Sequence, residues 1–355
     1  MNQLGRHLAD RISLSGPLSI AEYMAAALGH PKWGYYTSRD PLGRAGDFTT
    51  APEISQMFGE LIGLWCADRW QAMGRPGHFS LAELGPGRGT LMADTLRAGS
   101  ALPGFLDAAH IHLVETSPVL RGAQENALAG RTVAWHDRIA DLPDGPILVI
   151  ANEFFDALPI RQFQRGRNGW HERMVDVRDD AFIPVLSPLA VPGVDFPEAA
   201  MDAVFEVSPA RSAALSAVAH HIGGHGGAAL IIDYGHGTSA VGETFQAMRA
   251  HEYVDPFQDP GAADLTAHVD FQALAAAAHE AGARAHGPVS QGRFLDQLGI
   301  GARADRLKIR ATEAQVKDID GALHRLTAQD QMGQLFKVMA VTKPDSPPPP
   351  GLEDV

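Results

Sequence analysis

Three glycines alternate with other residues in the stretch LAELGPGRGTLMADTL, residues 81–96, and an acidic residue stands shortly before them. Gly85, Gly87 and Gly89 have no Cβ, so the turn can adopt positive φ angles and a ligand can approach its backbone. A turn that leads into a helix also exposes N–H groups that bind phosphate or carboxylate. Pyrophosphate, a nicotinamide dinucleotide and S-adenosylmethionine (SAM) are the three ligands that such a turn could hold.

The neighbouring residues favour one of these ligands. A phosphate-binding P-loop requires a lysine, whereas Thr90 and Leu91 follow the last glycine, and the dinucleotide fingerprint requires a glycine at position 90. The GxGxG spacing preceded by Glu83 is typical of class I methyltransferases. The SAM carboxylate can bind the turn, and its ammonium and sulfonium groups favour a nearby acid such as Glu83. On the glycines alone, a tight strand-to-helix turn without a ligand remains an alternative.

Two further acids follow the next apolar segments. Glu115 ends the segment IHLVE, and an acid at that position can accept hydrogen bonds from both ribose hydroxyls. Asp137, in AWHDRI, is expected near the adenine amine or, alternatively, as a solvated turn acid. Glu83 and Glu115 together favour SAM as the cofactor.

Polar residues also follow the fourth and fifth apolar segments. Asn152, Glu153 and Asp156 lie in ANEFFDALP, and Asp233 and His236 end ALIIDYGH. Ligands of open α/β sheets bind beyond the carboxyl ends of the strands, so these side chains are expected to face the methyl-donor crevice. For Asp156 the alternative is a helix cap.

No metal site is expected. His220, His221 and His225 are spaced as metal ligands could be, but HHIGGHGG contains no cysteine or carboxylate to support them. A helix end terminated by glycine is the preferred interpretation.

The apolar segments predict the scaffold that positions these residues. FSLAEL, IHLVE, ILVIANE and ALIIDYG are nearly continuous apolar runs, as in parallel strands buried on both faces by helices. We predict an α/β fold with a Rossmann-like, doubly wound sheet over residues 79–239 and a closing strand over 334–343. A hairpin insertion near residues 161–210 is expected to turn at Asn168-Gly169.

The remaining segments are expected to flank this core. Residues 1–78 should form N-terminal helices and a loop, residues 30–52, that closes as a lid, with a helix from about Pro52. Trp33, Tyr35 and Tyr36 are expected either to cover the substrate or to anchor the helices. Residues 240–333 are predicted as a helical insertion on the substrate side, and residues 344–355 as a disordered tail.

Composition excludes several classes of partner. The 355 residues contain 29 Lys plus Arg and 42 Asp plus Glu, a net charge of −13 that would repel nucleic acid. A lone cysteine cannot form an internal disulfide, and neither a signal peptide nor a membrane span is recognised. A cytoplasmic protein without membrane insertion is expected; the sequence does not indicate its oligomeric state.

Several stretches together resemble one family. They are GDFTTAPEISQMFGELIG (46–63), ELGPGRGTLMADTLR (83–97), VETSPVLRGAQ (114–124), ANEFFDALPIRQF (151–163), LIIDYGH (230–236), DLTAHVDF (264–271) and QGRFLDQLGI (291–300). The chain resembles the MidA-like family, bacterial relatives of the mitochondrial protein arginine methyltransferase that assists assembly of respiratory complex I. The resemblance extends over nearly the whole chain, and its FTTAPEIS and NEFFDALP stretches are the most specific.

This resemblance implies a SAM-dependent methyltransferase, and the mitochondrial activity is symmetric ω-N-dimethylation of an arginine in a complex I core subunit. Gly85, Gly87 and Gly89 match the SAM turn of the family, Glu115 its ribose acid, and Asn152 with Glu153 its motif after the fourth strand.

An arginine acceptor must be held by carboxylates because its guanidinium is a poor nucleophile. Glu153 is the first candidate for this role, Asp156 or Asp233 the second acid, and His236 a proton acceptor. A SAM-binding assembly chaperone and a small-molecule methyltransferase are the alternatives.

Overall fold

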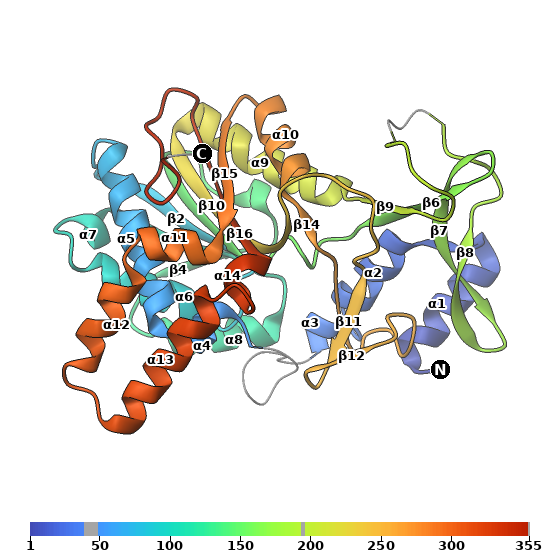
Figure 1. Ribbon diagram of the computed structural model, residues 1–355, viewed down its shortest axis with the longest axis horizontal. Coiled ribbons are helices and arrows are strands. Elements are labelled where there is room, and N and C mark those ends of the chain that lie inside the picture. The colour runs from blue at the N-terminus through green and yellow to red at the C-terminus, as the bar shows by residue number, and fades with distance from the viewer. Residues whose placement is uncertain (39–48, 193–195, 354–355) are drawn as a thin grey trace. The chain divides into compact units, whose positions relative to one another are not determined.

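A computed structural model describes residues 1–38, 49–192 and 196–353 of the chain (Figure 1). The chain forms two compact units, each assembled from segments that are distant in sequence. The first unit contains Met1–Phe48, Asp156–Ser212 and Thr238–His268, and the second contains Thr49–Phe155, Ala213–Gly237 and Val269–Val355.

The second unit is built on an eight-stranded sheet. Its strands are β2 (Phe79–Leu84), β3 (Ala109–Val114), β4 (Val133–His136), β5 (Ile147–Asn152), β10 (Gly227–His236), β14 (Val269–Asp270), β15 (Arg284–Ser290) and β16 (Phe336–Thr342). The order is β15-β16-β10-β5-β2-β3-β4, with β14 paired to β10. Strands β2, β3, β4, β5 and β10 run parallel, whereas β16 is antiparallel to both of its neighbours. The sheet confirms the expected α/β fold class.

Strand order reverses at β2, which positions the candidate site. Strand β3 pairs with one edge of β2 and β5 with the other. In open parallel sheets a ligand crevice lies beyond the carboxyl ends of the strands at such a reversal. The glycine turn at 85–89 follows β2 directly and is therefore at this reversal point.

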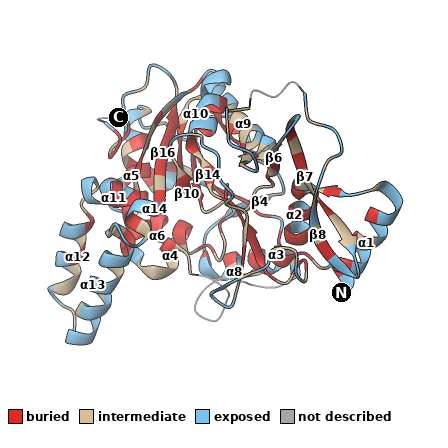
Figure 2. Ribbon diagram, turned by 45° about the vertical axis from the view of Figure 1, so that its right-hand side comes forward, coloured by how far each residue is buried: buried red, intermediate tan, exposed pale blue. Residues whose placement is uncertain are grey.

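Helices cover both faces of this sheet. They are α4 (Ala51–Ile54), α5 (Gln56–Ala72), α6 (Thr90–Gly99), α7 (Phe105–Ala108), α8 (Pro118–Ala127), the second-unit part of α9 (Pro209–His225), α10 (Phe271–Glu280), α11 (Gln291–Gln297), α12 (Ile300–Lys308), α13 (Glu313–Thr327) and α14 (Met332–Leu335). Figure 1 shows α9 and α10 on one side of the strands and α5 and α6 on the other. Buried residues colour β10 and β16 largely red in Figure 2, as expected of strands covered on both faces.

Two glycines let α5 approach α6 closely. A Cβ at Gly59 would lie 2.5 Å from the Cβ of Asp94, and one at Gly63 would lie 2.6 Å from the carbonyl oxygen of Thr95. Neither distance is possible for a real side chain, so glycine is required at both positions. The close packing holds the middle of α6, the helix that follows the glycine turn, against the N-terminal half of α5.

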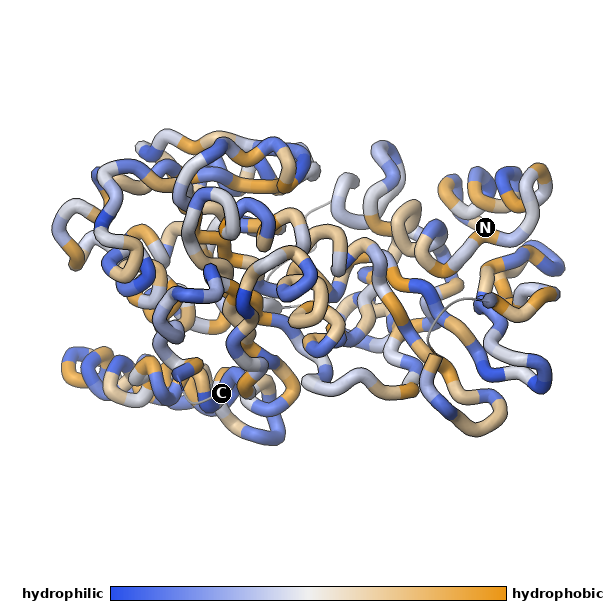
Figure 3. The backbone as a smooth tube through the Cα atoms, turned by 90° about the horizontal axis from the view of Figure 1, so that it is seen from above, coloured by the Kyte–Doolittle hydropathy of each residue, from blue (hydrophilic) through white to orange (hydrophobic). Residues whose placement is uncertain are grey.

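The first unit combines N-terminal helices with two small sheets. Its helices are α1 (Gln3–Ser15), α2 (Ile20–Gly29) and α3 (Tyr35–Ser38). One sheet contains β1 (Leu18–Ser19), β6 (Arg161–Gly166), β7 (Gly169–Arg178), β8 (Ala181–Leu186) and β9 (Val204–Val207); the other contains β11 (Gln246–Arg249), β12 (Glu252–Val254) and β13 (Asp264–Thr266). Leu4, Leu8 and Ile12 form the buried stripe of α1. Figure 3 shows the corresponding mixture of hydrophobic and hydrophilic colours within the turns of the helices.

The grouping of segments differs from the expected linear division at residue 78. Helices α1 and α2 belong with the inserted hairpin, because β1 pairs with β7 in register Leu18 to Val175, while α5 belongs to the second unit. The segment 240–333 is also less helical than expected. It contributes β11, β12 and β13 to the first unit, and β14 and β15 to the central sheet.

The hairpin of β6 and β7 turns one residue earlier than expected. Gly166 pairs with Gly169, so Arg167-Asn168 forms the connection rather than Asn168-Gly169. Gly169 begins the returning strand with φ +133°, a backbone angle that favours glycine. The sequence correctly predicted a glycine next to the turn. Its positive φ, however, belongs to the first residue of β7 and not to the turn itself.

The C-terminal segment is packed, contrary to the expected disorder. Leu352 is 1% exposed and belongs to the main core of the second unit, and Gly351 turns at φ +79° beside Phe294. The guanidinium of Arg69 donates to the carbonyl oxygen of Pro347 at 3.2 Å. Prolines reduce the conformational freedom that folding must remove, so one buried leucine can anchor this short segment. Residues 354–355 lie outside the described residues.

The aromatic residues near position 35 anchor the first unit. Tyr35 is fully buried, and the Tyr36 hydroxyl donates to Asp264 Oδ1 at 2.8 Å. Trp33 stacks on His30 with ring centroids 4.7 Å apart. These contacts match the anchoring alternative rather than a cover over substrate. The greater part of the expected lid, residues 39–48, lies outside the described residues.

Candidate active site

The glycine turn adopts the backbone angles that its sequence implied. Gly85, Gly87 and Gly89 have φ values of +60°, +52° and +82°. A Cβ at Gly85 would lie 3.0 Å from the ring of Phe154, and one at Gly89 would lie 3.3 Å from the Cα of Gln124. Gly89 is also the N-cap of α6. The turn thus presents a helix N-terminus at the end of β2, as a carboxylate-binding turn requires.

Glu83 lies beneath this turn as a buried acid. Its side chain is 2% exposed, and the N–H of Met92 in the first turn of α6 donates to the carboxylate. Among the described residues, Glu83 Oε2 has no hydrogen-bond partner. Burial raises the pKa of Glu83 well above its usual value. A buried carboxylate oxygen without a donor is costly unless a ligand supplies one, so this oxygen suits a cationic group.

Asn152 provides a second buried acceptor on the same face of the sheet. Glu83 pairs with Ile150 in the register of β2 and β5, so Glu83 and Asn152 project from the same face at the carboxyl ends of neighbouring strands. Within the described parts of the chain, Asn152 Oδ1 is buried without a hydrogen-bond partner. Two such acceptors side by side fit an ammonium group, which only donates. The residues therefore fit the methionine end of SAM.

Glu115 is held at the corner after β3. The N–H of Ser117 donates to Glu115 Oε1 at 2.8 Å, and Gln124 Nε2 donates to Oε2 at 3.3 Å. The residue is 8% exposed, and burial raises the pKa of its carboxyl group. Its position after β3, next to the glycine turn, is the one expected for an acid that binds the ribose hydroxyls.

Asp137 occupies a more solvated position than the proposed adenine contact suggests. Its side chain is 74% exposed and its Oδ1 accepts from Arg121 at 2.7 Å. The surroundings match the alternative of a solvated turn acid, here paired with an arginine of α8. The contact with the adenine amine stays a prediction.

Glu153 stands at the end of β5 in an unusual conformation. Its φ is +50°, a left-handed backbone angle that costs free energy in a residue with a side chain. Its N–H donates to the carbonyl oxygen of Ile232 at 2.9 Å, and its Oε1 accepts from the N–H of Ala51 at 3.1 Å and from Asn152 Nδ2 at 3.3 Å. Backbone strain of this kind concentrates at functional sites.

Residues 49–55 contribute contacts that the sequence did not predict. Thr90 Oγ1, directly after the last glycine, donates to Glu53 Oε1 at 2.6 Å, while Ala51 bonds to Glu153 as described. The short helix α4 therefore joins the glycine turn to the end of β5. The FTTAPEIS stretch was recognised only as a family signature; these bonds explain its physical importance.

The carboxylate of Asp233, in β10, contacts backbone N–H groups; the expected role as a second acid stays a prediction. It is fully buried, and its carboxylate accepts from the N–H of Phe155 at 3.0 Å and from the N–H of Tyr234 at 2.9 Å. Both bonds fix backbone, and the first holds the loop that follows Glu153. Asp233 is thus a positioning residue for that loop.

His236 lies farther along β10, where the strand pairs with β14. Its Nε2 is 3.8 Å from Asp270 Oδ2, and its side chain is 34% exposed. Asp270 also caps α10, because its Oδ1 accepts from the N–H of Ala273 at 3.0 Å. A histidine ring nitrogen beside a carboxylate is a candidate proton acceptor.

Asp156 belongs to the first unit, whereas the other candidate residues belong to the second. Its carbonyl oxygen accepts from the guanidinium of Arg211 at 3.0 Å and from the N–H of Ala267 at 3.2 Å. Burial, and then the carboxylates of Asp264 and Asp156, raise the pKa of Tyr36. These contacts lie within the first unit, and the expected role of Asp156 as a second acid stays a prediction.

His221 and His225, near the end of α9, contact the segment before β5, at the end of the sheet opposite to the glycine turn. His221 Nε2 donates to the carbonyl oxygen of Gly145 at 3.0 Å, and His225 lies 3.4 Å from Asp144. Across the described residues, no group of three or more His, Cys, Asp or Glu side chains is arranged to hold a metal ion.

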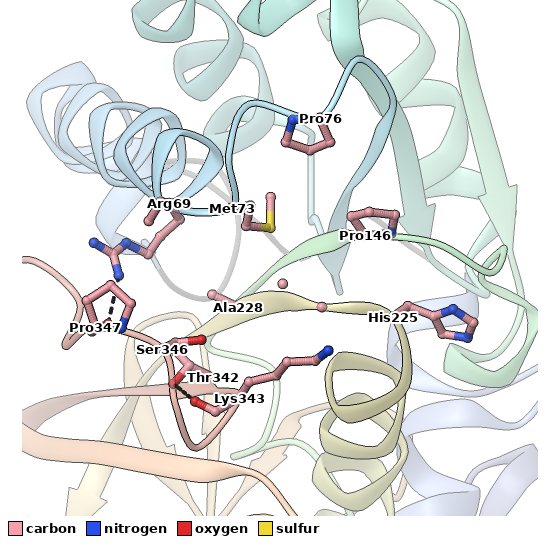
Figure 4. Close-up of a pocket in the computed structure, with 13 residues that line it drawn as sticks. Arg69, Met73, Pro76, Pro146, His225, Ala228, Thr342, Lys343, Ser346 and Pro347 are labelled. Carbon is pink, nitrogen blue, oxygen red and sulfur yellow. Dashed lines mark hydrogen bonds between the residues drawn. The ribbon is translucent and has the colours of Figure 1, made fainter.

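A pocket of about 190 Å³ lies at this same end of the sheet (Figure 4). Lys343, Met73 and Pro146 line it, and β10 begins in its wall at Gly227. The glycine turn instead follows the carboxyl end of β2. The pocket is therefore separate from the candidate site.

None of the helices in the described ranges is both long enough and apolar enough to cross a bilayer.

Comparison with known proteins identifies the family of the chain. Residues 61–289 match the sequence profile of a family of S-adenosyl-L-methionine-dependent methyltransferases. The chain is 40% identical to "Protein arginine methyltransferase NDUFAF7, mitochondrial" of Xenopus laevis, over 96% of this chain and 84% of that protein. It is 37% identical to the Homo sapiens protein of the same name, over 95% of this chain and 82% of that one.

A solved structure provides a further match. A superfamily member from Burkholderia thailandensis, described as a candidate methyltransferase and bound to S-adenosyl-homocysteine, superposes with a TM-score of 0.84. It is 30% identical, and the match covers 98% of this chain and 92% of that one. This likeness, the family profile and the relatives together establish SAM as the cofactor. The chain belongs to the MidA-like family of SAM-dependent methyltransferases.

Proposed function

We propose that this methyltransferase acts on an arginine side chain of a protein. The names of the relatives support an arginine acceptor. The observation that carries the proposal is Glu153, an acid at φ +50° directly beside Asn152 at the end of β5. A carboxylate carried on a strained backbone at this strand end is suited to hold a guanidinium next to the bound donor.

The chain supplies the groups that hold the donor. The turn formed by Gly85, Gly87 and Gly89 would bind its carboxylate at the N-terminus of α6, while Glu83 Oε2 and Asn152 Oδ1 would accept hydrogen bonds from its ammonium. Glu115 would accept hydrogen bonds from the ribose hydroxyls. When bound, SAM supplies an electrophilic methyl group on a sulfonium sulfur.

Methyl transfer to arginine has a defined atom balance. One guanidinium nitrogen forms a bond to the methyl carbon, the carbon–sulfur bond breaks, and its electron pair remains on sulfur to give S-adenosylhomocysteine (SAH). The methylated guanidinium must also lose one proton. Glu153 would orient the guanidinium through charge-assisted hydrogen bonds, and His236, beside Asp270, would accept the proton. Asp233 would contribute by holding the loop after Glu153.

The test of this assignment replaces Glu153 by Gln. Glu153→Gln keeps the shape of the side chain but removes its charge, so we expect SAH affinity within about threefold of wild type and transfer to a protein acceptor reduced at least about 100-fold. Calorimetry measures the first quantity, and labelled SAM with cell lysate measures the second. Glu280→Gln, at an exposed position of α10, is the control and should change neither.

The other possible functions are distinguishable outcomes of this test. Turnover retained by Glu153→Gln would contradict its assignment. A wild-type protein that binds SAH but labels nothing would indicate an assembly chaperone, and label in a small metabolite would indicate a small-molecule methyltransferase.

The identity of the acceptor is the finer part of the proposal. We place it in a core subunit of respiratory complex I, modified by symmetric ω-N-dimethylation, and the enzyme in the cytoplasm. The family resemblance supports this acceptor, although the relatives carry "mitochondrial" in their names. Mass spectrometry of complex I from cells with and without the gene should identify one arginine whose dimethylation disappears; an unchanged pattern would contradict this acceptor.

A further inference from the structure

One face of α8 makes a series of contacts with the corner that holds Glu115. Ser117 is the N-cap of this helix, and Arg121 and Gln124 lie one and two turns farther along. The N–H of Ser117 donates to Glu115 Oε1 at 2.8 Å, and Arg121 Nε donates to the carbonyl oxygen of Glu115 at 2.9 Å. Side chains with this spacing share one helix face, so α8 approaches Glu115 through a single face.

Gln124 makes the most extensive of these contacts. It is fully buried, and its Nε2 donates both to the carbonyl oxygen of Gly87 at 2.7 Å and to Glu115 Oε2 at 3.3 Å. Its Oε1 accepts from Trp135 Nε1 at 2.8 Å. One amide thus joins the glycine turn after β2, the acid after β3 and the strand β4.

Trp135 determines which way this amide points. An indole N–H only donates, so it must face the amide oxygen of Gln124. The amide NH₂ group is then directed at Gly87 and Glu115, both of which accept. The orientation follows from the chemistry of the partners, and all of the polar atoms of the Gln124 side chain are used.

We propose that Gln124 is a positioning residue that makes SAM affinity depend on the ribose hydroxyls, by fixing the Glu115 carboxylate relative to the glycine turn. The inference rests on the proposed ribose role of Glu115. Gln124 itself need not touch the cofactor. It acts through the glycine turn itself and through Glu115. Gln124 ends the family stretch VETSPVLRGAQ, but the sequence assigned it no role.

Gln124→Met retains the length and most of the volume of the side chain but cannot donate hydrogen bonds. The carbonyl of Gly87 and the Glu115 carboxylate would both lose a buried donor, and a hydrogen bond to a charged group carries more free energy than a neutral one. We therefore expect SAH affinity to fall roughly tenfold, measured by calorimetry. Glu125→Gln, at an exposed position of the same helix, is the matched control and should bind like wild type.

The ribose dependence separates positioning from general packing. A 2′,3′-dideoxy analogue of SAH lacks the hydroxyls that Glu115 would bind, so wild type should bind it weakly and Gln124→Met should lose little further affinity for it. In a double-mutant cycle with Glu115→Ala, the two losses should be strongly non-additive. Equal losses for both ligands, or additive losses in the cycle, would overturn the proposal.

Two further measurements keep the test decisive. With a saturating protein acceptor and varied SAM, Gln124→Met should raise KM for SAM while leaving kcat within about twofold, because only donor binding is affected. Trp135→Phe keeps Gln124 but removes the bond that orients its amide, so it should produce a smaller loss in the same direction. If Trp135→Phe and Gln124→Met both bind SAH like wild type, Gln124 has no positioning role. SAH binding requires no acceptor, so this result is independent of whether arginine is methylated.

Discussion

At the scale of single residues, the site contains an acid whose protonation should be coupled to ligand binding. Burial raises the pKa of Glu83 well above its usual value, so the ligand-free protein retains a proton there at pH values where an exposed carboxyl has lost it. An ammonium group beside Glu83 Oε2 favours the ionised form. Binding of SAH should therefore release a proton.

This coupling gives a prediction with a definite sign. SAH affinity of the wild type should rise between pH 5 and 7, as the cost of ionising Glu83 falls, and calorimetric enthalpies should differ between buffers with different ionisation enthalpies. Glu83→Gln should bind SAH more weakly, roughly tenfold or more, and with less dependence on pH. Because burial also raises the pKa of Glu115, Glu115→Gln is the control and should retain the Glu83 contribution. Buffer-independent enthalpies for wild type would contradict the coupling.

The same raised pKa bears on stability. A carboxyl whose folded pKa exceeds its unfolded pKa contributes stability that is present below the unfolded value and is lost as pH rises through the folded value. Ligand-free wild type should accordingly lose unfolding free energy between pH 5 and 7 relative to Glu83→Gln. Urea unfolding at the two pH values measures this difference.

Sequence patterns identified the residues that are expected to contact the cofactor, but not the residues that hold them in place. The glycine spacing, Glu83 and Glu115 were recognisable because each follows an apolar strand at a fixed place. Gln124 carries no such pattern, and its importance arises only from the packing of α8 on the turn. The position of Asp233 near a strand end likewise did not reveal that backbone N–H groups donate to its carboxylate.

At the scale of elements, the C-terminal segment should act as part of the core. Leu352 is 1% exposed, so Leu352→Ala should remove about 2–5 kcal/mol from the free energy of unfolding. Denaturant unfolding measures this change. Leu64→Ala, at a position that is 49% exposed on α5, is the control and should cost less than about 1 kcal/mol. Equal stability of Leu352→Ala and wild type would mean that the segment is not packed in solution.

The strands that could be predicted share one property. β2, β3, β5, β10 and β16 are nearly continuous apolar runs, a pattern that buried parallel sheets produce. β15 has the sequence RAHGPVS, without alternation, and its register shifts between His286 and Val289. The proline-rich tail has the composition of disorder, while its single buried leucine gives no periodic signal. Local composition cannot identify such elements because long-range pairing determines them.

At the scale of the whole molecule, the two units could not be read from the linear order of the chain. The first unit joins N-terminal helices to a hairpin more than a hundred residues away, through the pairing of β1 with β7. Its core includes Leu4, Tyr23 and Val175, whereas the core of the second unit includes Trp65, Leu81 and Leu230. Neither set is contiguous in sequence, so only the tertiary structure defines which segments unfold together.

The separate cores lead to a prediction about ligand stabilisation. A ligand that binds only the folded state stabilises it by about 2.7 kcal/mol at 100 times its Kd. All proposed cofactor contacts lie in the second unit, so SAH at that concentration should slow amide hydrogen exchange most in β2, the glycine turn and α8. The buried helices α1 and α2 should exchange at unchanged rates, because the residues that pack them belong to a different core.

Glu153→Gln should give the same pattern as wild type, since it retains SAH binding, whereas Gln124→Met should require a higher SAH concentration for the same protection. Equal protection of α1 and α2 in wild type would show that the two units unfold as one cooperative structure.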